Sequence, residues 1–393
     1  MPFGLWRPVG EPDWDAIVVG AGPAGSTTAR LLGGRGHRVL LLDRAAFPRP
    51  KPCGDSINPG AVNELRELGL LDLIRGLPHA PIAGWRVRSE RGHAFEAEFP
   101  CGTSGIGIDR SDFDAALVSE AVRAGSTLRC GVRVVDLLTT DGDVAGVRGA
   151  DGEEIPARVV VGADGLRSVV VRKLGLIRRA PRLRKMALTA KVRGREGGGC
   201  LGELHLTPWG CVGIADVGRD TANVVAVMSA GAKMLGRGAE TRFDLAVSSI
   251  PSLTGAIRVS RVLATGPFDW PTRGTTAPGA LLVGDAAGYY DPFTGQGIYR
   301  ALRGARLAAK AVDEALRGDA DASFRRYEAA YRRSFAGSRR LQHLIEGVTS
   351  RPWLFGSAAT AFQRWPILPN RLLEVTGDLA PASHLLSSST CRH

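Results

Sequence analysis

The 393-residue sequence has no apolar run approaching the roughly 18 residues that a membrane-spanning helix requires. Its first fifteen residues, MPFGLWRPVGEPDWD, lack the apolar core of a secretory signal peptide. No internal repeat and no RNA- or DNA-binding motif is recognisable. These absences argue against a membrane-spanning, secreted or nucleic-acid-binding protein and predict a cytoplasmic one.

Cysteine is scarce, and its spacing excludes two further classes of protein. None of the cysteines forms a Cys-x-x-Cys pair, and none lies near a histidine at a spacing suited to zinc. A disulfide framework and a metal site are therefore not expected, and most of these thiols are predicted to be free and buried. The six are Cys53, Cys101, Cys130, Cys200, Cys211 and Cys391.

Acidic residues are outnumbered, with 39 Asp and Glu against 51 Lys and Arg, which gives a formal net charge of +12. The excess favours anionic partners such as phosphates or an acidic membrane surface, although a compositional bias towards arginine explains part of it. With 44% hydrophobic and 23% charged residues, the composition is that of a globular protein. The length suits two domains or one large α/β body with an inserted lobe.

A glycine motif stands near the start of the chain between two apolar runs. Residues 15–20, DAIVVG, predict a buried parallel strand, residues 26–36 a helix, and residues 37–43 a second strand that ends at Asp43. Between them, Gly20, Gly22 and Gly25 form G-x-G-x-x-G. In this context the motif predicts dinucleotide binding, because an acidic residue follows about 20 positions later.

Each residue of this motif has a distinct physical task. Gly20 permits the tight turn, Gly22 allows a pyrophosphate to approach the backbone, and Gly25 allows close packing of helix and strand. The helix N-terminus offers unpaired N–H groups to the phosphates, and Asp43 can accept hydrogen bonds from a ribose. The motif alone fits NAD and FAD equally well, and a purely structural glycine turn is the alternative.

Two later segments each place a strand before an aspartate and a turn. Residues 158–168, RVVVGADGLRS, contain Asp164-Gly165, and residues 281–298, LLVGDAAGYYDPFTGQGI, contain Gly284-Asp285. The second segment leads into a long helix from about Gly297. Gly295-Gln296-Gly297 at that helix N-terminus can direct N–H groups at the electron-rich edge of a flavin.

Together with FPRPKPCGDSINPGAV at 47–62, these segments resemble the para-hydroxybenzoate hydroxylase structural superfamily and, within it, the geranylgeranyl reductase family, with flavin-dependent halogenases as relatives. The resemblance covers about residues 14–310. It implies an α/β fold: a Rossmann-like FAD-binding domain of the glutathione reductase type, an inserted antiparallel β-sheet substrate lobe and C-terminal helices. FAD is the implied cofactor.

The resemblance also implies which residues contact FAD. Val132 is expected on a strand beside the adenine, Arg110 at the phosphate or ribityl region, and Asp285 at the ribityl chain. A surface arginine and an ordinary turn aspartate are the alternatives for Arg110 and Asp164. The full set is Gly20, Gly22, Pro23, Ala24, Gly25, Asp43, Arg44, Cys53, Gly54, Arg110, Val132, Asp164, Gly165, Gly284, Asp285, Gly295, Gln296, Gly297 and Ile298, of which the last four face the isoalloxazine.

Cys53 lies in a stiff loop, between Pro52 and Gly54, that in the resembling family runs beside the flavin and the substrate. As a candidate catalytic residue, its thiol either donates a proton or only packs against the ring. Lys51, with Arg44 and Arg49 before it, is equally explained as solvated charge.

The sequence departs from the family in the substrate lobe. Prenyl reductases carry aromatic-x-Trp-x-Phe-Pro there and halogenases Trp-x-Trp-x-Ile-Pro, whereas HLTPWGCVGIADVG has Trp209 alone. This argues against halogenation and leaves the isoprenoid undetermined. Residues 204–228 predict two or three antiparallel strands with turns at Pro208 and 218–220, and Trp209 is expected in the core or the wall.

The predicted organisation has three parts. A discontinuous FAD-binding domain spans 12–80, 100–180 and 262–345, the substrate lobe spans 81–99 and 181–261, and a helical tail spans 346–393.

A long helix is predicted at 322–346. Its aromatic residues Phe324, Tyr327, Tyr331 and Phe335 recur at helical spacing and predict a buried face. Arginines at 325, 332 and 339 form a stripe, which is either a solvated face or a contact for an anionic membrane. The tail after it either packs on the core or forms an amphipathic membrane contact.

The leading functional hypothesis is FAD-dependent reduction of carbon–carbon double bonds in an isoprenoid or other long apolar substrate. The expected partner is thus a small apolar substrate molecule, possibly prenyl-type. No second nucleotide-binding unit is visible, so NAD(P)H binding transiently or a reduced carrier protein is expected to supply electrons. An NAD(P)H-dependent monooxygenase of the same fold is the alternative. A halogenase and a non-catalytic electron carrier rank below it.

Overall fold

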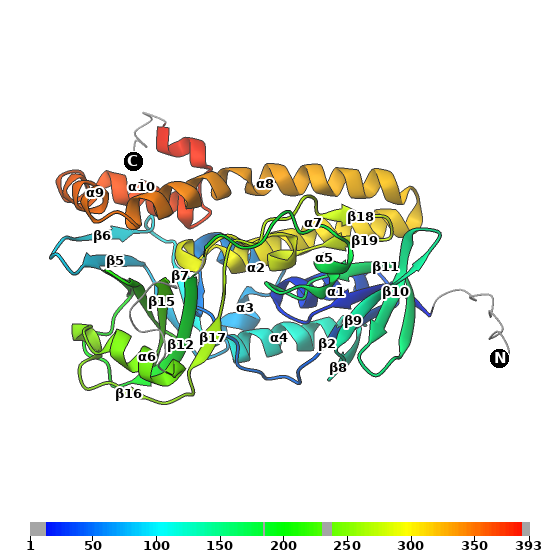
Figure 1. The fold of residues 1–393 in the computed structure, drawn as a ribbon, viewed down its shortest axis with the longest axis horizontal. Helices are drawn as coiled ribbons and strands as arrows, with labels where there is room; N and C mark the ends of the chain where they lie inside the picture. Colours follow the sequence, from blue (N-terminus) through cyan, green and yellow to red (C-terminus); the bar gives the residue numbers. More distant parts are fainter. Residues whose placement is uncertain (1–12, 184, 230–237, 387–393) are drawn as a thin grey trace.

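The computed structural model describes residues 13–183, 185–229 and 238–386. The predicted domain ranges also take in residues 12, 184, 230–237 and 387–393, the last of which include Cys391, and these lie outside the described residues. Two large sheets lie side by side, and the C-terminal helices run across the top of both (Figure 1).

The first sheet carries the predicted dinucleotide-binding unit at its centre. Its order is β18-β19-β11-β1-β2-β8, with β10 beside β11 and β9 beside β10. From β19 to β8 neighbouring strands are parallel, so their carboxyl ends meet at one edge. The bounds are β1 Trp14–Val19, β2 Val39–Asp43, β8 Thr127–Cys130, β9 Val134–Thr140, β10 Asp143–Gly149, β11 Glu154–Gly162, β18 Thr276–Ala277 and β19 Ala280–Leu282.

The core of this half follows directly from the apolar runs of its strands. All five residues of β2 are buried, as are the last four of β1, because they belong to a core that also includes side chains of α1, α7, α8 and the strands β9 and β10. The β-α-β unit is confirmed, but α1 (Pro23–Gly33) begins three residues earlier than expected. Proline suits the first position of a helix, since its missing N–H would have no partner there.

The second sheet is mainly antiparallel and forms the other half of the molecule. Its order is β16-β12-β15-β14-β13-β5-β6, with β17 beside β12, and a small sheet β3-β7-β4 lies between the halves. The bounds are β3 Ser56–Ile57, β4 His79–Ile82, β5 Gly84–Ser89, β6 Ala94–Glu98, β7 Gly105–Ile108, β12 Lys185–Arg193, β13 Leu201–Thr207, β14 Gly210–Asp216, β15 Thr221–Ser229, β16 Ile257–Arg258 and β17 Leu263–Thr265.

The expected strands around Trp209 are confirmed as three, β13 to β15. Trp209 lies in the turn between β13 and β14. It packs with the lobe core around Phe243 of α6. Among the described residues it does not line the cavity described below. Trp209 therefore contributes to the packing of the substrate lobe.

The remaining helices include four short 3₁₀ turns. The bounds are α2 Pro59–Glu67, α3 Leu71–Arg75, α4 Arg110–Arg123, α5 Val169–Lys173, α6 Ala239–Val247, α7 Gly297–Arg317, α8 Ala320–Thr349, α9 Pro352–Arg364, α10 Ile367–Thr376, η1 Pro251–Leu253, η2 Gly284–Ala287, η3 Pro292–Thr294 and η4 Ala382–Leu386. No helix within the described ranges is both long and apolar enough to cross a membrane.

Helix α8 confirms the aromatic face predicted for it. Its four aromatic residues are all buried, and the Tyr327 hydroxyl donates to the Leu282 carbonyl at 2.6 Å, which ties the helix to β19. Arg325 and Arg332 are exposed, and the Arg339 side chain lies outside what the structure describes.

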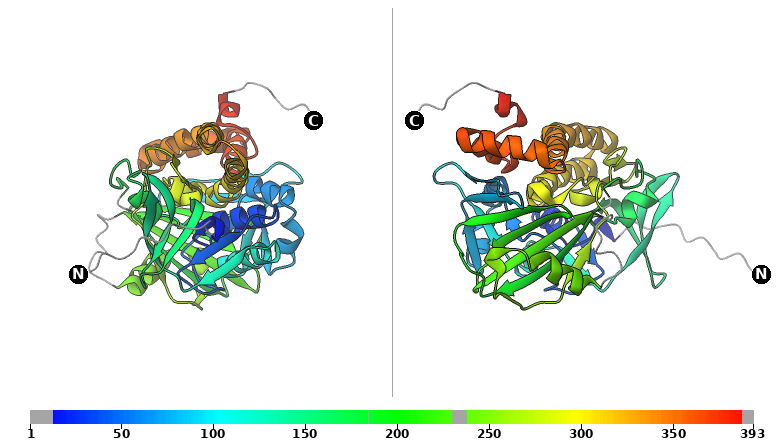
Figure 2. Two further views of the ribbon diagram at one scale, coloured as in Figure 1. Left: turned by 90° about the vertical axis from the view of Figure 1, so that its right-hand side faces the viewer. Right: turned by 60° about the vertical axis from the view of Figure 1, so that its left-hand side comes forward.

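After α8 the chain turns back over the second sheet (Figure 2). The Gln363 side chain donates to the Ala94 carbonyl at 2.7 Å, and the Glu98 amide donates to Asn370 Oδ1 at 2.9 Å. These contacts fasten α9 and α10 to strand β6. The tail thus packs on the fold as far as residue 386.

Candidate functional site

A cavity of about 570 Å³ lies where the two halves meet. At one end it reaches the glycine loop, the Cys53 loop and the segment 284–298. At the other end its walls are apolar side chains of the second sheet and of the C-terminal helices. The apolar wall includes Trp85, Val87, Phe95, Leu204, Val225, Val227, Leu341, Ile345, Phe355 and Phe362.

The three glycines of the loop differ in what surrounds them. A Cβ on Gly25 would lie 1.8 Å from the Gly20 carbonyl oxygen, and one on Gly20, whose φ is +100°, would lie 2.5 Å from the Ala163 oxygen. Both positions therefore require glycine for folding. A Cβ on Gly22 would approach only the tips of Arg49 and Lys51, each at 3.9 Å. The space above Gly22 is thus bordered by two cations.

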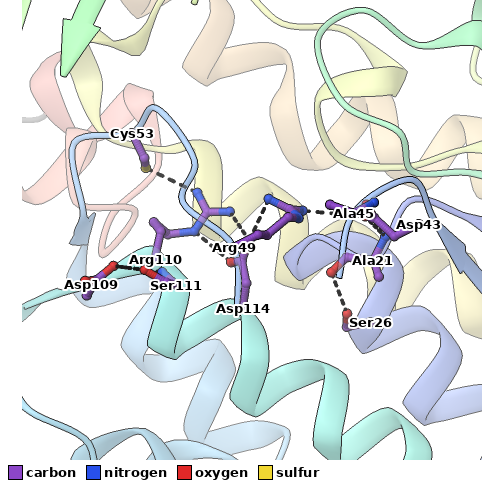
Figure 3. Close-up of polar contacts among 10 residues, drawn as sticks. All are labelled: Ala21, Ser26, Asp43, Ala45, Arg49, Cys53, Asp109, Arg110, Ser111 and Asp114. Atoms are coloured by element: carbon purple, nitrogen blue, oxygen red, sulfur yellow. Dashed lines mark hydrogen bonds and ion pairs between the residues drawn. The ribbon is translucent and has the colours of Figure 1, made fainter. Parts of the chain in front are cut away.

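Asp43 at the end of β2 holds this loop in place. Its carboxylate accepts hydrogen bonds from the Ala21 amide at 2.8 Å and the Ala45 amide at 2.9 Å (Figure 3). Arg49 Nη2 lies 3.6 Å from Asp43 Oδ2. The aspartate that was expected at a ribose therefore also links the glycine loop to the loop that carries Cys53.

Arg49 and Lys51 supply donors for an anion at the N-terminus of α1. Arg49 Nη1 lies 3.6 Å from Asp114 Oδ2, but its Nε is buried and has no hydrogen-bond partner among the described residues. Burial, and then the charge of Arg110, lower the pKa of Lys51. A bound phosphate would raise the pKa of Lys51 again, since it brings negative charge close to both cations. The two side chains are thus not solvated charge, whereas Arg44 is exposed.

Cys53 lines the cavity and is held by contacts on two sides. Arg110 Nη1 donates to its Sγ at 3.2 Å, and Asn223 Nδ2 donates to its carbonyl oxygen at 2.8 Å. Arg110 in turn donates to both oxygens of Asp114, at 2.8 and 2.9 Å (Figure 3). Burial acts to lower the pKa of the Arg110 guanidinium. The Asp114 carboxylate has the larger opposite effect, so the pKa is raised. Arg110 is therefore a buried support of the Cys53 loop, not a surface arginine.

Another buried group lies two residues after Cys53 in the chain. Asp55 has a left-handed backbone with φ of +53°, and its Oδ1 has no hydrogen-bond partner among the described residues. Burial raises the pKa of Asp55 to about 7, although the nearby charges of Lys191 and Arg110 act to lower it. Lys191 is ion-paired with Asp109. Sequence reasoning missed this cluster, because its members are far apart in the chain.

Most residues expected at the cofactor do border the cavity. Gly295 has a φ of +67°, which places the start of α7 so that its first turn faces the space. The lining residues from the expected set are Gly22, Pro23, Ala24, Cys53, Gly54, Arg110, Gly165, Gly284, Asp285, Gly295, Gly297 and Ile298.

One expected residue is placed differently, and the side chain of another has a contact that was not predicted. Val132 is not on a strand as predicted: β8 ends at Cys130, because Gly131 turns the chain with a φ of +78°. Val132 lies in the connection to β9, where its amide donates to the Asp43 carbonyl at 3.1 Å. Asp164 Oδ2 accepts from the Val169 amide at 2.6 Å and so caps α5.

The Gln296 side chain faces the C-terminal tail and not the cavity. Its Nε2 donates to Asp378 Oδ1 at 2.7 Å, and its Oε1 accepts from Ser338 at 2.7 Å. Asn58 donates to the other oxygen of Asp378 at 2.7 Å. Asp378 thus joins the tail to both loops that border the cavity. It lies outside every motif, so no sequence signal marked it.

Two further cavity residues escaped sequence reasoning. Tyr289 lines the cavity beside Phe268, with ring centroids 5.8 Å apart, and burial raises its pKa well above the usual range. Cys211 of β14 lines it too, and burial raises the pKa of its thiol to about 12.

Known proteins resemble this chain across nearly its whole length. A family profile described as an FAD binding domain matches residues 13–196. Digeranylgeranylglycerophospholipid reductase 1 of Methanopyrus kandleri is 30% identical over 359 residues, covering 85% of this chain and 91% of that protein. The chain belongs to the geranylgeranyl reductase-like family of FAD-dependent oxidoreductases. A menaquinone reductase of Mycobacterium tuberculosis is 32% identical over 76% of each chain.

Solved structures show that this FAD-dependent oxidoreductase shares its fold with enzymes of other chemistry. The flavin-dependent brominase Bmp2 matches with a TM-score of 0.81 at 21% identity over 93% of each chain. PqsL, titled a probable FAD-dependent monooxygenase from Pseudomonas aeruginosa, matches with a TM-score of 0.73 at 22% identity over 88% of this chain and 99% of that one. At these identities the likeness concerns the fold alone.

The residues of this flavoprotein fit the phosphates of FAD at the glycine loop. The unfilled space above Gly22, the orphaned Arg49 Nε and the half-buried Lys51 converge on the N-terminus of α1. From there the cavity continues past Asp285 towards Cys53 and the first turn of α7.

Proposed function

We propose that this FAD-dependent oxidoreductase reduces carbon–carbon double bonds in a long apolar, prenyl-type substrate. The observation that carries the proposal is the cavity: beyond the expected flavin position, its walls are almost entirely aliphatic and aromatic. Such walls suit a hydrocarbon chain and exclude water from the reacting bond. The names of the relatives, a prenyl-lipid reductase and a menaquinone reductase, support the same class of substrate.

The chemistry divides between cofactor and chain. When bound and reduced, FAD supplies the electron pair that is transferred as hydride. Saturating an alkene also requires one proton at the second carbon, and the chain must provide it. Cys53 is the proposed donor. Because Arg110 donates a hydrogen bond to Sγ, the thiol hydrogen of Cys53 is directed away from Arg110. Cys53 also borders the cavity.

The test uses the FAD-loaded protein, reduced with dithionite without oxygen. A digeranylgeranyl lipid should reoxidise it and gain two hydrogen atoms per double bond reduced, measured by flavin absorbance and mass spectrometry. The fully saturated lipid is the matched control and should leave the protein reduced. Reoxidation by neither lipid would refute the proposal. An oxygenated product formed in air with NADPH would assign the protein to the monooxygenases instead.

A Cys53→Ser variant tests the proton donor. It should bind FAD normally yet reduce the alkene slower by on the order of hundredfold, the usual contribution of a general acid. Cys101→Ser, at an exposed thiol in a turn, is the control and should behave as the original protein. An unchanged rate in Cys53→Ser would show that the thiol only packs.

A further inference from the structure

The last helices carry large apolar side chains that no other part of the described fold covers. Of the eleven large hydrophobic residues that are exposed within the described ranges, five lie between 344 and 368. They are Leu344 (63% exposed), Trp353 (67%), Trp365 (52%), Ile367 (57%) and Leu368 (39%), and we name them the tail surface. Isolated exposed hydrophobics are ordinary, but such a concentration on consecutive helices marks an interaction site.

The tail surface continues into the cavity. Leu344 of α8 and Leu368 of α10 are exposed and also line the cavity. Ile345 of α8 and Phe355 and Phe362 of α9 also line the cavity. Apolar side chains of α8 and α10 are therefore exposed at the surface and also border the cavity.

The stretch of chain that carries most of the tail surface has charge of one sign. Residues 347–373 contain three arginines, at 351, 364 and 371, and no acidic residue. Acidic residues border this stretch: Glu346 and Glu374 flank it in the chain, and the exposed Glu96 and Glu98 lie on the neighbouring strand β6. Arg351 and Arg364 are exposed, and the Arg364 guanidinium lies 5.8 Å from the centre of the Trp365 ring. Tryptophan beside arginine is typical of side chains at the level of lipid headgroups. The complementary partner is a surface that is apolar beneath and anionic above.

We propose that the tail surface docks on an anionic lipid bilayer, with Trp353, Trp365 and Ile367 inserted among the headgroups. The mouth of the cavity between Leu344 and Leu368 then faces the membrane. A prenyl chain enters from the bilayer without crossing water, while the flavin end stays remote from the lipid. The identity of the entering chain rests on the proposed function, but docking itself requires neither substrate nor turnover.

Vesicle sedimentation with the FAD-loaded protein tests the docking. At low salt the protein should bind vesicles of phosphatidylcholine mixed with phosphatidylglycerol and bind phosphatidylcholine alone far more weakly. Brominated lipids should quench its tryptophan fluorescence. Trp353→Ser and Trp365→Ser should each weaken partitioning by about tenfold, as expected for losing one large apolar side chain from the membrane. The double variant should also lose most of the quenching.

Ile257→Ser is the matched control, because Ile257 is 70% exposed on β16 of the substrate lobe, away from the tail. FAD content and melting temperature show whether each variant is folded. Equal vesicle binding by the double variant and the original protein would overturn the proposal. So would a dimer, seen by analytical ultracentrifugation, that the same two substitutions abolish, because the surface would then join two copies. Vesicle binding without alkene reduction would refute the proposed function and leave the docking intact.

Discussion

At the level of single residues, the glycine loop at the carboxyl edge of the first sheet serves both folding and anion binding. The G-x-G-x-x-G motif alone does not show which glycine serves which purpose. Gly20 and Gly25 have no room for a side chain because backbone oxygens occupy it. Gly22 has room, and the groups around it are the cations Arg49 and Lys51. Folding and anion binding therefore depend on different glycines of one motif.

This separation makes Gly22→Val an informative substitution. The variant should fold, since the nearest atoms are flexible side-chain tips 3.9 Å away, but its side chain fills the phosphate space. We expect FAD binding to weaken by on the order of hundredfold, about 3 kcal/mol, measured by fluorescence titration. Gly25→Val is the contrasting variant and should fail to fold. Full FAD content in folded Gly22→Val would place the phosphates elsewhere.

For the helices and loops, the distinctive feature is the attachment of the tail at Asp378. Its two carboxylate oxygens accept from Gln296 and Asn58, each at 2.7 Å, and so connect α10 to the loops before α7 and α2. Burial raises the pKa of Asp378 to about 7, although both hydrogen bonds act to lower it. The carboxyl therefore joins three segments that all border the cavity.

Asp378→Ala should release the tail without unfolding the FAD-binding half. The change leaves the Gln296 amide without its carboxylate acceptor and removes one of the two hydrogen bonds that Asn58 Nδ2 donates, which costs on the order of 2 kcal/mol. Limited proteolysis should cut residues 350–386 faster than in the original protein, while FAD stays bound. Asp321→Ala, at an exposed position in the first turn of α8, should leave the cleavage rate unchanged. Equal protection of the tail in both variants would show that apolar packing alone holds it.

In the molecule as a whole, the substrate lobe depends on a buried ion-pair cluster that makes its stability sensitive to acid. Burial alone would raise the pKa of Glu203. Hydrogen bonds from His205 at 2.8 Å and Ser252 at 2.7 Å, together with the charge of Arg195, outweigh burial and lower it from 4.5 to about 2. A carboxyl with a lowered pKa stabilises the fold above its unfolded value and loses that contribution as the pH falls.

The free energy of unfolding should therefore decrease by on the order of 3 kcal/mol through this group as the pH falls from about 4.5 to 2. Urea unfolding followed by tryptophan fluorescence at several pH values measures it. Glu203→Gln should be less stable near pH 6 but lose less stability on acidification. Glu96→Gln, in a more exposed pair with Arg86, should follow the original pH profile. Parallel profiles for Glu203→Gln and the original protein would contradict the assignment.

Sequence reasoning reached the elements that have a local signal. The unit β1-α1-β2, the start of α7 and the aromatic face of α8 follow from glycine spacing and apolar periodicity, and all are confirmed. Periodicity shows that a face is buried but not what covers it. For that reason the sequence could not predict that the tail lines the cavity or that Gln296 donates a hydrogen bond to Asp378.

One residue of the candidate site was predicted wrongly. The family resemblance implied that Val132 lies on a strand, but the positive φ of Gly131 ends β8 before it. The pairing of Arg110 with Asp114 could have been read from their spacing of four on a helix, whereas the contact with Cys53 spans 57 residues and could not.

The discontinuous FAD site has a consequence for how the protein is made on the ribosome. The glycine loop emerges early, but β19 and the start of α7, which complete the site, are synthesised more than 250 residues later. Until β19 pairs with β11, the edge of β11 that it covers is open, and open edges promote aggregation. FAD cannot stabilise the nascent chain during most of translation. Cells that overproduce the protein should therefore depend on chaperones more than on flavin supply to obtain it in folded form.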